Sequence, residues 1–257
     1  MFVIERRPEK GCQFMKLLFV RHGDPDYTID SLTEKGWREA AFLAERLSAI
    51  DAKAWYVSPL GRAKDTAKCT LEKNRCKAEE CLWLREFHAP IWRPDVTEHK
   101  MIPWDWLPQD WMTDERFFSR DQWFLPEVFQ QSDVKAEYDR VTNAFDLLLK
   151  KHGYERDGFY YHAVVPNNDT LVFFCHFGVG CVLLSHLLNV SPMILWHGCC
   201  AAPTSVTTVA TEERRAGIAV FRMLSYGDTS HLYCHNEPPA FAARFRETRN
   251  NEWERQD

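Results

Sequence analysis

The 257-residue sequence has no long hydrophobic run, and its apolar stretches, such as residues 17–20 and 171–175, are short. A membrane-spanning helix needs about 20 apolar residues, so we expect no membrane span. The sequence also lacks an excess of positive charge, with 32 basic residues against 37 acidic ones and a net charge of −5. Nucleic-acid binding and polybasic membrane binding are therefore not expected. Any affinity for an anion must come from a local cluster of side chains.

A disulfide framework is also missing, because the nine cysteines are odd in number and scattered. Residues 1–14 are mixed and charged and lack the order of a signal peptide. Both observations predict a reducing, cytoplasmic location. Two clusters look like metal sites at first sight, one around His231 and one around His197. Their spacing fits no zinc motif, so we expect no metal ion and no cofactor.

The composition that remains is that of a globular protein, with 45% hydrophobic and 27% charged residues. The length suffices for one domain with a sizeable core, and we expect a single domain over residues 1–257. Residues 1–14 are predicted to be an N-terminal extension, and Met15 is an alternative start. No internal repeat or low-complexity segment is visible.

Apolar and β-branched runs predict strands at 16–20, 54–57, 79–84 and 170–175. Helical patterns follow at Thr33, at Ser58, over 133–151 and over 181–188, and a hairpin is expected at Asp157-Gly158. Residues 204–211 and 219–224 are predicted to pair with each other. Strands that alternate with helices favour an α/β fold. We expect a three-layer sandwich with a mostly parallel central sheet flanked by helices.

Residues 88–131 lose this periodicity and contain five of the ten tryptophans: Trp92, Trp104, Trp106, Trp111 and Trp123. Linkers are not rich in aromatic residues, so this segment is predicted to be an insertion or cap with short helices. Most of these rings are expected to form its own small core. One or two could instead face the functional site, and a protein-binding patch is the third interpretation.

Basic and imidazole side chains follow the predicted strands. Arg21 and His22 follow the first strand, Arg62 lies in the helix after the second, and His176 follows the strand at 170–175. Ligands of open α/β sheets bind beyond the carboxyl ends of the strands. Arginine forks match phosphate oxygens, and Gly23 would allow close approach of the backbone. The sequence therefore predicts a phosphate-binding pocket.

This set of residues predicts phosphoryl chemistry. Neighbouring arginines lower the pKa of an imidazole, which keeps it neutral and nucleophilic. Glu86 would donate a proton to the leaving oxygen, with two alternatives left open: His88 as the acid, or Glu86 as a structural partner of an arginine. Further candidate substrate contacts are Asp26, Tyr27, His88 and His231, although Asp24 and Asp26 are more typical of turns.

Five motifs in order resemble those of the histidine phosphatase superfamily, phosphoglycerate-mutase-like branch (branch 1): FVRHG at 19–23, LTEKG at 32–36, SPLGRA at 58–63, LRE at 84–86 and CHFG at 175–178. The resemblance covers roughly residues 16–85 and 170–232. It implies that His22 is a phosphohistidine nucleophile, that Arg21, Arg62 and His176 hold the phosphoryl group, and that Glu86 is the proton donor. It implies no metal for this step.

The sequence departs from the mutase pattern in three places, one of which is the absence of the glutamate–serine–leucine segment that mutases carry. Asp24-Pro25-Asp26-Tyr27 follows Gly23, where mutases carry a small hydroxyl residue and then asparagine, and the segment after Glu86 differs as well. Phe177 after His176 also argues against the acid phosphatase and phytase branch. We therefore expect a metal-independent phosphomonoester hydrolase acting on a small phosphorylated metabolite. The alternatives are a phosphomutase or a catalytically silent relative that binds a phospholigand or a protein. The oligomeric state stays open, a homodimer included.

Overall fold

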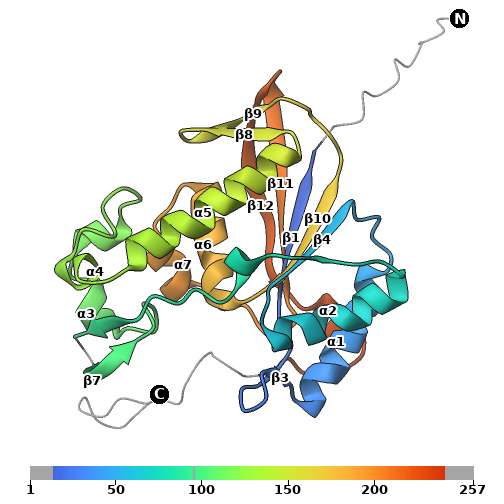
Figure 1. The fold of residues 1–257 in the computed structure, drawn as a ribbon, viewed down its shortest axis with the longest axis horizontal. Helices are drawn as coiled ribbons and strands as arrows, with labels where there is room; N and C mark the ends of the chain where they lie inside the picture. The colour runs from blue at the N-terminus through green and yellow to red at the C-terminus, as the bar shows by residue number, and fades with distance from the viewer. Residues whose placement is uncertain (1–13, 95, 241–257) are drawn as a thin grey trace, which may run out of the picture.

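The computed structural model describes residues 14–94 and 96–240 (Figure 1). Residues 1–13 of the expected extension and the tail from residue 241 lie outside the described residues. An eight-stranded sheet, with the order β5-β4-β10-β1-β11-β12-β9-β8, forms the centre. In that order its strands are β5 Glu79–Glu80, β4 Ala54–Val57, β10 Thr170–Cys175, β1 Lys16–Arg21, β11 Val206–Arg215, β12 Ile218–Asp228, β9 Tyr160–Ala163 and β8 Tyr154–Asp157.

The two halves of the sheet differ in strand direction. Strands β5, β4, β10 and β1 run parallel to one another, whereas β11, β12, β9 and β8 continue the sheet by antiparallel pairing. Five of the six residues of β1 and all six of β10 are buried, as expected for strands covered on both faces. The predicted α/β architecture, with a central sheet flanked by helices, is confirmed.

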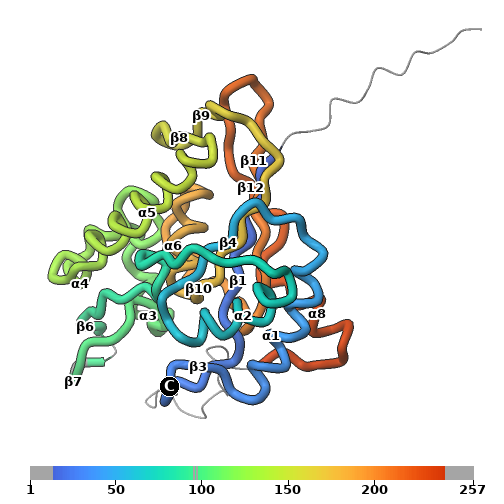
Figure 2. Tube along the Cα trace, turned by 45° about the vertical axis from the view of Figure 1, so that its right-hand side comes forward, coloured from blue at the N-terminus to red at the C-terminus, as the bar shows by residue number. Residues whose placement is uncertain are grey.

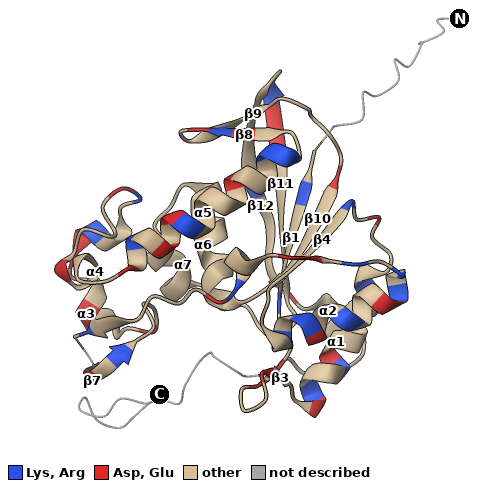
Figure 3. Ribbon diagram, in the orientation of Figure 1, with Lys and Arg blue, Asp and Glu red and all other residues tan. Residues whose placement is uncertain are grey.

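Helices cover both faces of the sheet (Figures 1 and 2). The bounds are α1 Glu34–Leu47 and α2 Gly61–Asn74 on one face, and α5 Val134–Lys151, α6 Phe177–Leu188 and α7 Pro192–Gly198 on the other. Alternate side chains of β1 supply both layers: Leu18 packs with the α1 and α2 side, and Leu17 with the α5 and α6 side. The outer helices carry charges of both signs (Figure 3).

Two local predictions hold and two need correction. Thr33 caps α1 by accepting a hydrogen bond from the Gly36 amide at 3.0 Å, and β8 and β9 form the expected hairpin. The strand predicted over 79–84 is wrong beyond Glu80, because a 3-10 turn, η1 Leu82–Leu84, directs Leu84 into the core. The helix after β4 begins at Gly61, three residues after the expected start at Ser58.

The insertion contains more than the predicted short helices. It consists of the hairpin β6 Ile91–Arg93 with β7 Val96–Met101, followed by α3 Pro108–Trp111, η2 Glu115–Phe118 and α4 Glu127–Gln130. Trp104, Trp106, Trp111 and Trp123 are buried in the cluster that also contains Phe19 and Phe173 of the sheet. They therefore extend the main core, and the expectation of a separate small core is wrong. Trp92 is 50% exposed.

Three short elements lie outside the central sheet and its covering helices. The two-residue strands β2 Pro25–Asp26 and β3 Ser31–Leu32 pair with each other, and α8 Ser230–Tyr233 follows the sheet and packs beside α1. No helix in the described ranges is long and apolar enough to cross a membrane.

Candidate active site

The carboxyl ends of three parallel strands meet at one edge of the sheet. Arg21 at the end of β1 pairs in register with Cys175 at the end of β10. The backbone amide of His22 donates to the Cys175 carbonyl at 3.0 Å, and that of Ser58 donates to the Phe174 carbonyl at 2.9 Å. These bonds bring the residues after each strand together, as predicted.

His22 is buried and held in one tautomer. Its Nδ1 lies 2.8 Å from the Gly23 carbonyl oxygen. A carbonyl only accepts hydrogen bonds, so Nδ1 carries the proton. Burial, followed by the charges of Arg21 and Arg62, lowers the pKa of His22 well below its ordinary value. The imidazole is therefore neutral near pH 7, and its Nε2 carries a free lone pair.

His176 lies beside His22, with 5.1 Å between the ring centroids. It occupies the capping position before α6, and a hydrogen bond of 2.7 Å joins its Nε2 to the Ser58 hydroxyl. Burial, then the neighbouring His22 and Arg62, lowers the pKa of His176 well below its ordinary value. Its Nδ1 is buried and has no hydrogen-bond partner among the described residues.

Two arginines flank the imidazoles, and each is anchored through its Nη1 atom. Nη1 of Arg21 donates to the carbonyl of Ala201, and Nη1 of Arg62 donates to the carboxylate of Asp30. The Nε atoms of both arginines are buried without a partner within the described part of the chain. Buried donors normally have partners, so this pair provides charge and hydrogen bonds for an anion.

Asp30 is a site residue that the sequence patterns did not indicate. Its Oδ2 also accepts a hydrogen bond from the Gly61 amide at 2.7 Å. A Cβ atom at position 61 would lie 2.1 Å from the Asp30 carbonyl oxygen, so only glycine fits here. Asp30 itself has a left-handed backbone, with φ of 48°, which aspartate tolerates better than most residues. It fixes Arg62 at the start of α2.

The carboxyl group of Glu86 lies against the start of α6. One carboxyl oxygen accepts from the Val179 amide at 3.0 Å and the other from the Gly178 amide at 3.3 Å. Burial raises the pKa of Glu86 and outweighs these hydrogen bonds and the charge of Arg21. The carboxyl thus lies two to three residues after His176 along α6, whereas the side chain of His88 is exposed.

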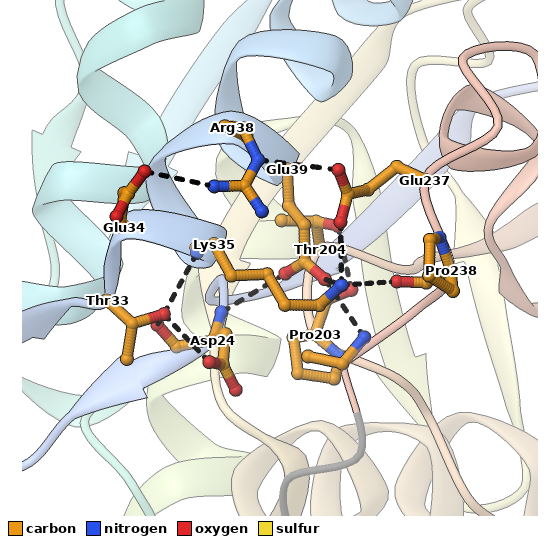
Figure 4. Close-up of polar contacts among 12 residues, drawn as sticks. Asp24, Thr33, Glu34, Lys35, Arg38, Glu39, Pro203, Thr204, Glu237 and Pro238 are labelled. Carbon is orange, nitrogen blue, oxygen red and sulfur yellow. Dashed lines mark hydrogen bonds and ion pairs between the residues drawn. The ribbon is translucent and has the colours of Figure 1, made fainter.

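The loop after Gly23 is fixed by its own contacts (Figure 4). Asp24 accepts from the Thr33 hydroxyl at 2.7 Å, and its amide donates at 3.3 Å to Glu39, a buried carboxyl of α1. Asp26 accepts from the Thr28 amide at 3.0 Å, as a turn-forming residue does. The Tyr27 ring is exposed, with its centroid 5.3 Å from Cζ of Arg62.

His231 is linked to His22 by hydrogen bonds through Thr204. The Thr204 hydroxyl donates to the Pro203 carbonyl, so it accepts from Nε2 of His231 at 3.1 Å. The Thr204 amide in turn donates to the His22 carbonyl at 3.1 Å. Burial lowers the pKa of His231 to about 4. Among the described residues, no group of three or more His, Cys, Asp or Glu side chains could hold a metal ion.

A neutral imidazole between two arginines, at the carboxyl ends of parallel strands, defines a class of α/β proteins suited to binding and transferring phosphoryl groups. Comparison with known families agrees: a family model described as histidine phosphatase superfamily (branch 1) matches residues 17–223. The chain belongs to this superfamily, and the resemblance expected from its motifs is confirmed.

The chain is similar in sequence to a mutase and in fold to two phosphatases. A 2,3-bisphosphoglycerate-dependent phosphoglycerate mutase of Thermoplasma acidophilum is 44% identical over 61 residues, which cover 20% of this chain and 30% of the relative. The match thus spans less than a third of that relative's length. Two solved structures share the fold at low identity. A phosphoserine phosphatase mutant of Entamoeba histolytica, in complex with phosphoserine, has a TM-score of 0.57 and 19% identity, covering 85% of this chain and 99% of that one. A mycobacterial glucosyl-3-phosphoglycerate phosphatase has a TM-score of 0.54 and 18% identity, covering 84% and 99%.

Proposed function

We propose that the protein is a phosphomonoester hydrolase that works through a covalent phosphohistidine on His22, with Glu86 as general acid and without a metal ion. The observation that carries this proposal is the state of His22. Its Nδ1 proton is committed to the Gly23 carbonyl, its pKa is lowered, and two arginines flank it. His176 is neutral beside the same arginines as well, but its Nε2 is engaged by the Ser58 hydroxyl, whereas Nε2 of His22 is left for the phosphorus atom.

In the first step, Nε2 of His22 attacks phosphorus in line with the leaving oxygen. The N–P bond forms while the P–O ester bond breaks, and the leaving oxygen takes the proton of Glu86. An alcohol leaves, and the enzyme holds phospho-His22 and a Glu86 carboxylate. The raised pKa of Glu86 supports this role, because the group must carry a proton at the start.

In the second step, a water molecule attacks the phosphohistidine. Glu86 takes one proton from the water, the new P–O bond forms, and the N–P bond breaks. Inorganic phosphate leaves, and neutral His22 and protonated Glu86 are restored. Arg21 and Arg62 would neutralise the charge of the phosphoryl oxygens in both steps, which is the main requirement of phosphoryl transfer. Neutral His176 would hold a phosphoryl oxygen by a hydrogen bond.

A phosphatase is favoured over a mutase by the loop after Gly23. Asp24 is engaged by Thr33 and Glu39 and holds the loop in place, and the residues that mutases carry here are absent from the sequence. The two phosphatases of similar fold act, by their names, on small phosphorylated metabolites. We propose a substrate of that class. A cytoplasmic location is proposed on the cysteine pattern alone.

The test is hydrolysis of a generic aryl phosphate in the presence of a chelator, by the unchanged protein, by His22→Ala and by His162→Ala. His162 is an exposed histidine of the β8–β9 hairpin and serves as the matched control. We expect chelator-resistant phosphate release that disappears only in His22→Ala. Equal activity of all three proteins would overturn the proposal. Interconversion of phosphoglycerates without net phosphate release would favour the mutase, and phosphate binding without turnover would favour a silent relative.

A further inference from the structure

We propose that Trp104 of the insertion is a positioning residue for Glu86: its indole ring covers the carboxyl group and keeps water from it. The inference rests on the proposed function, in which Glu86 is the general acid. It gives residues 88–131 a role in the chemistry and not only in covering the substrate.

The geometry centres on Gly178, the second residue of α6. A Cβ atom at this position would lie 2.5 Å from Cη2 and 2.7 Å from Cζ3 of Trp104, and 2.8 Å from Oε1 of Glu86. The edge of the indole ring and the carboxyl oxygen are therefore neighbours across the same glycine. A side chain at 178 would need the space that both groups border, so the glycine permits their close approach.

The insertion holds Trp104 in place by specific contacts. Arg93, 2% exposed, donates from Nη1 to the Trp104 carbonyl at 2.7 Å and from Nη2 to the Asp105 carbonyl at 2.9 Å. The Trp104 ring packs against Trp196 at 5.8 Å between ring centroids. Nε1 of Trp196 donates to the Gly178 carbonyl at 3.0 Å. The backbone of Trp104 is thus held in its own turn by Arg93, and its ring packs on Trp196, which is bonded to the helix that binds Glu86.

The groups around Glu86 shift the pKa of its carboxyl in opposite directions. The amides of Gly178, Val179 and Phe87 and the charge of Arg21 favour the carboxylate. His22 and His176 face the same pocket in the neutral form, and the buried thiols of Cys175 and Cys181 nearby have raised pKa values and are also neutral. Burial favours the protonated acid, and because its effect is the largest, the pKa of Glu86 is raised. The ring of Trp104 supplies part of that burial, so its removal should tip the balance towards the carboxylate.

The test measures the Glu86 pKa directly by NMR titration of protein labelled with 13C at the glutamate carboxyl carbons. Glu86→Gln assigns the signal. The variants are Trp104→Ala and Trp111→Ala, which remove equally large buried rings from the same insertion. Trp111 packs against Phe118 and His197. We expect the pKa to fall by about one unit in Trp104→Ala, with no fall in Trp111→Ala. The alkaline limb of the kcat/KM profile should move down by the same amount.

An unchanged Glu86 pKa in Trp104→Ala, or an equal fall in Trp111→Ala, would overturn the role of Trp104. If Trp104→Ala does not fold, Trp104→Phe and Trp104→Gln replace it. In Trp104→Phe the apolar ring should keep the Glu86 pKa raised, whereas in Trp104→Gln the amide should lower it. Equal Glu86 pKa values in the two variants would refute the inference. Because the titration needs no turnover, it separates the two proposals: active His22→Ala protein would refute the hydrolase mechanism and leave the Trp104 assignment to be decided by the NMR result.

Discussion

At the carboxyl ends of β1, β4 and β10, side chains are fixed by hydrogen bonds, whereas in residues 88–131 they are fixed by aromatic packing. His22, His176 and Arg62 each have one atom engaged by a backbone or side-chain partner and another left for a ligand. The four buried tryptophans of the insertion instead contact other rings, with centroids 4.6–6.1 Å apart.

The two regions thus meet different physical requirements. Phosphoryl transfer needs donors and charges that are in position before the substrate arrives. An insertion built from one short hairpin and short helices needs large apolar side chains to bury enough surface. Changes in the strand-end residues should therefore reduce rate at nearly constant stability, and changes in the buried tryptophans should reduce stability at nearly constant rate. Trp104 is the expected exception, because its replacement should change the reaction rate as well as the stability.

The largest effect is expected from Trp123→Ala. Trp123 is 2% exposed and packs against Phe129, Tyr138 and Trp196. Loss of this ring should lower the free energy of unfolding by about 4 kcal/mol, as measured by urea denaturation, while the folded protein keeps its kcat/KM. Trp92→Ala, at a half-exposed position, should change stability by less than about 1 kcal/mol. Similar losses in both variants would contradict the burial difference.

Glu86→Gln should have the opposite signature, with slower turnover and little change in stability. The amide cannot donate a proton as a carboxylic acid does, so hydrolysis of an alkyl phosphate should slow by about a hundredfold. Aryl phosphates should slow less, since their leaving groups need less protonation. Steady-state kinetics with both substrate types provides the measurement, and Glu80→Gln on the exposed strand β5 is the control. Equal slowing of both substrate types would indicate a structural role.

Glu39 offers a change in stability that depends on pH. Burial raises its pKa to about 7 from an ordinary value of 4.5. Between these values the folded protein keeps a proton that the unfolded chain releases, so stability falls as pH rises through this window. From pH 5 to pH 7, the unchanged protein should lose about 2 kcal/mol relative to Glu39→Gln.

Urea denaturation at pH 5, 6 and 7 checks this difference. Glu34→Gln, at an exposed position of the same helix, should follow the unchanged protein. If the unfolding free energies of Glu39→Gln and the unchanged protein fall in parallel, Glu39 does not titrate in this range.

Sequence patterns predicted the strand-end residues because apolar runs locate strands, and the residue after each run must lie at the sheet edge. The same reasoning could not predict Asp30, whose contact with Arg62 depends on the approach of two segments 32 residues apart. Nor could it distinguish Trp104 from the other tryptophans, since only the packed structure brings it to Gly178. The hairpin β6–β7 was missed because its strands alternate weakly, and the 3-10 turn after Glu80 because Leu82 and Leu84 also fit a strand.

Asp30 allows the smallest and most specific change in the strand-end region. Asp30→Asn keeps an acceptor for the Gly61 amide and suits the left-handed backbone, but it loses the ion pair with Arg62. Arg62 should then be held less firmly, and KM for an aryl phosphate should rise about tenfold with a smaller change in kcat. Asp157→Asn makes the same chemical change in the remote β8–β9 hairpin and should leave KM unaltered. An unchanged KM in Asp30→Asn would mean that Arg62 is positioned by its packing at the start of α2 and does not depend on its carboxylate partner.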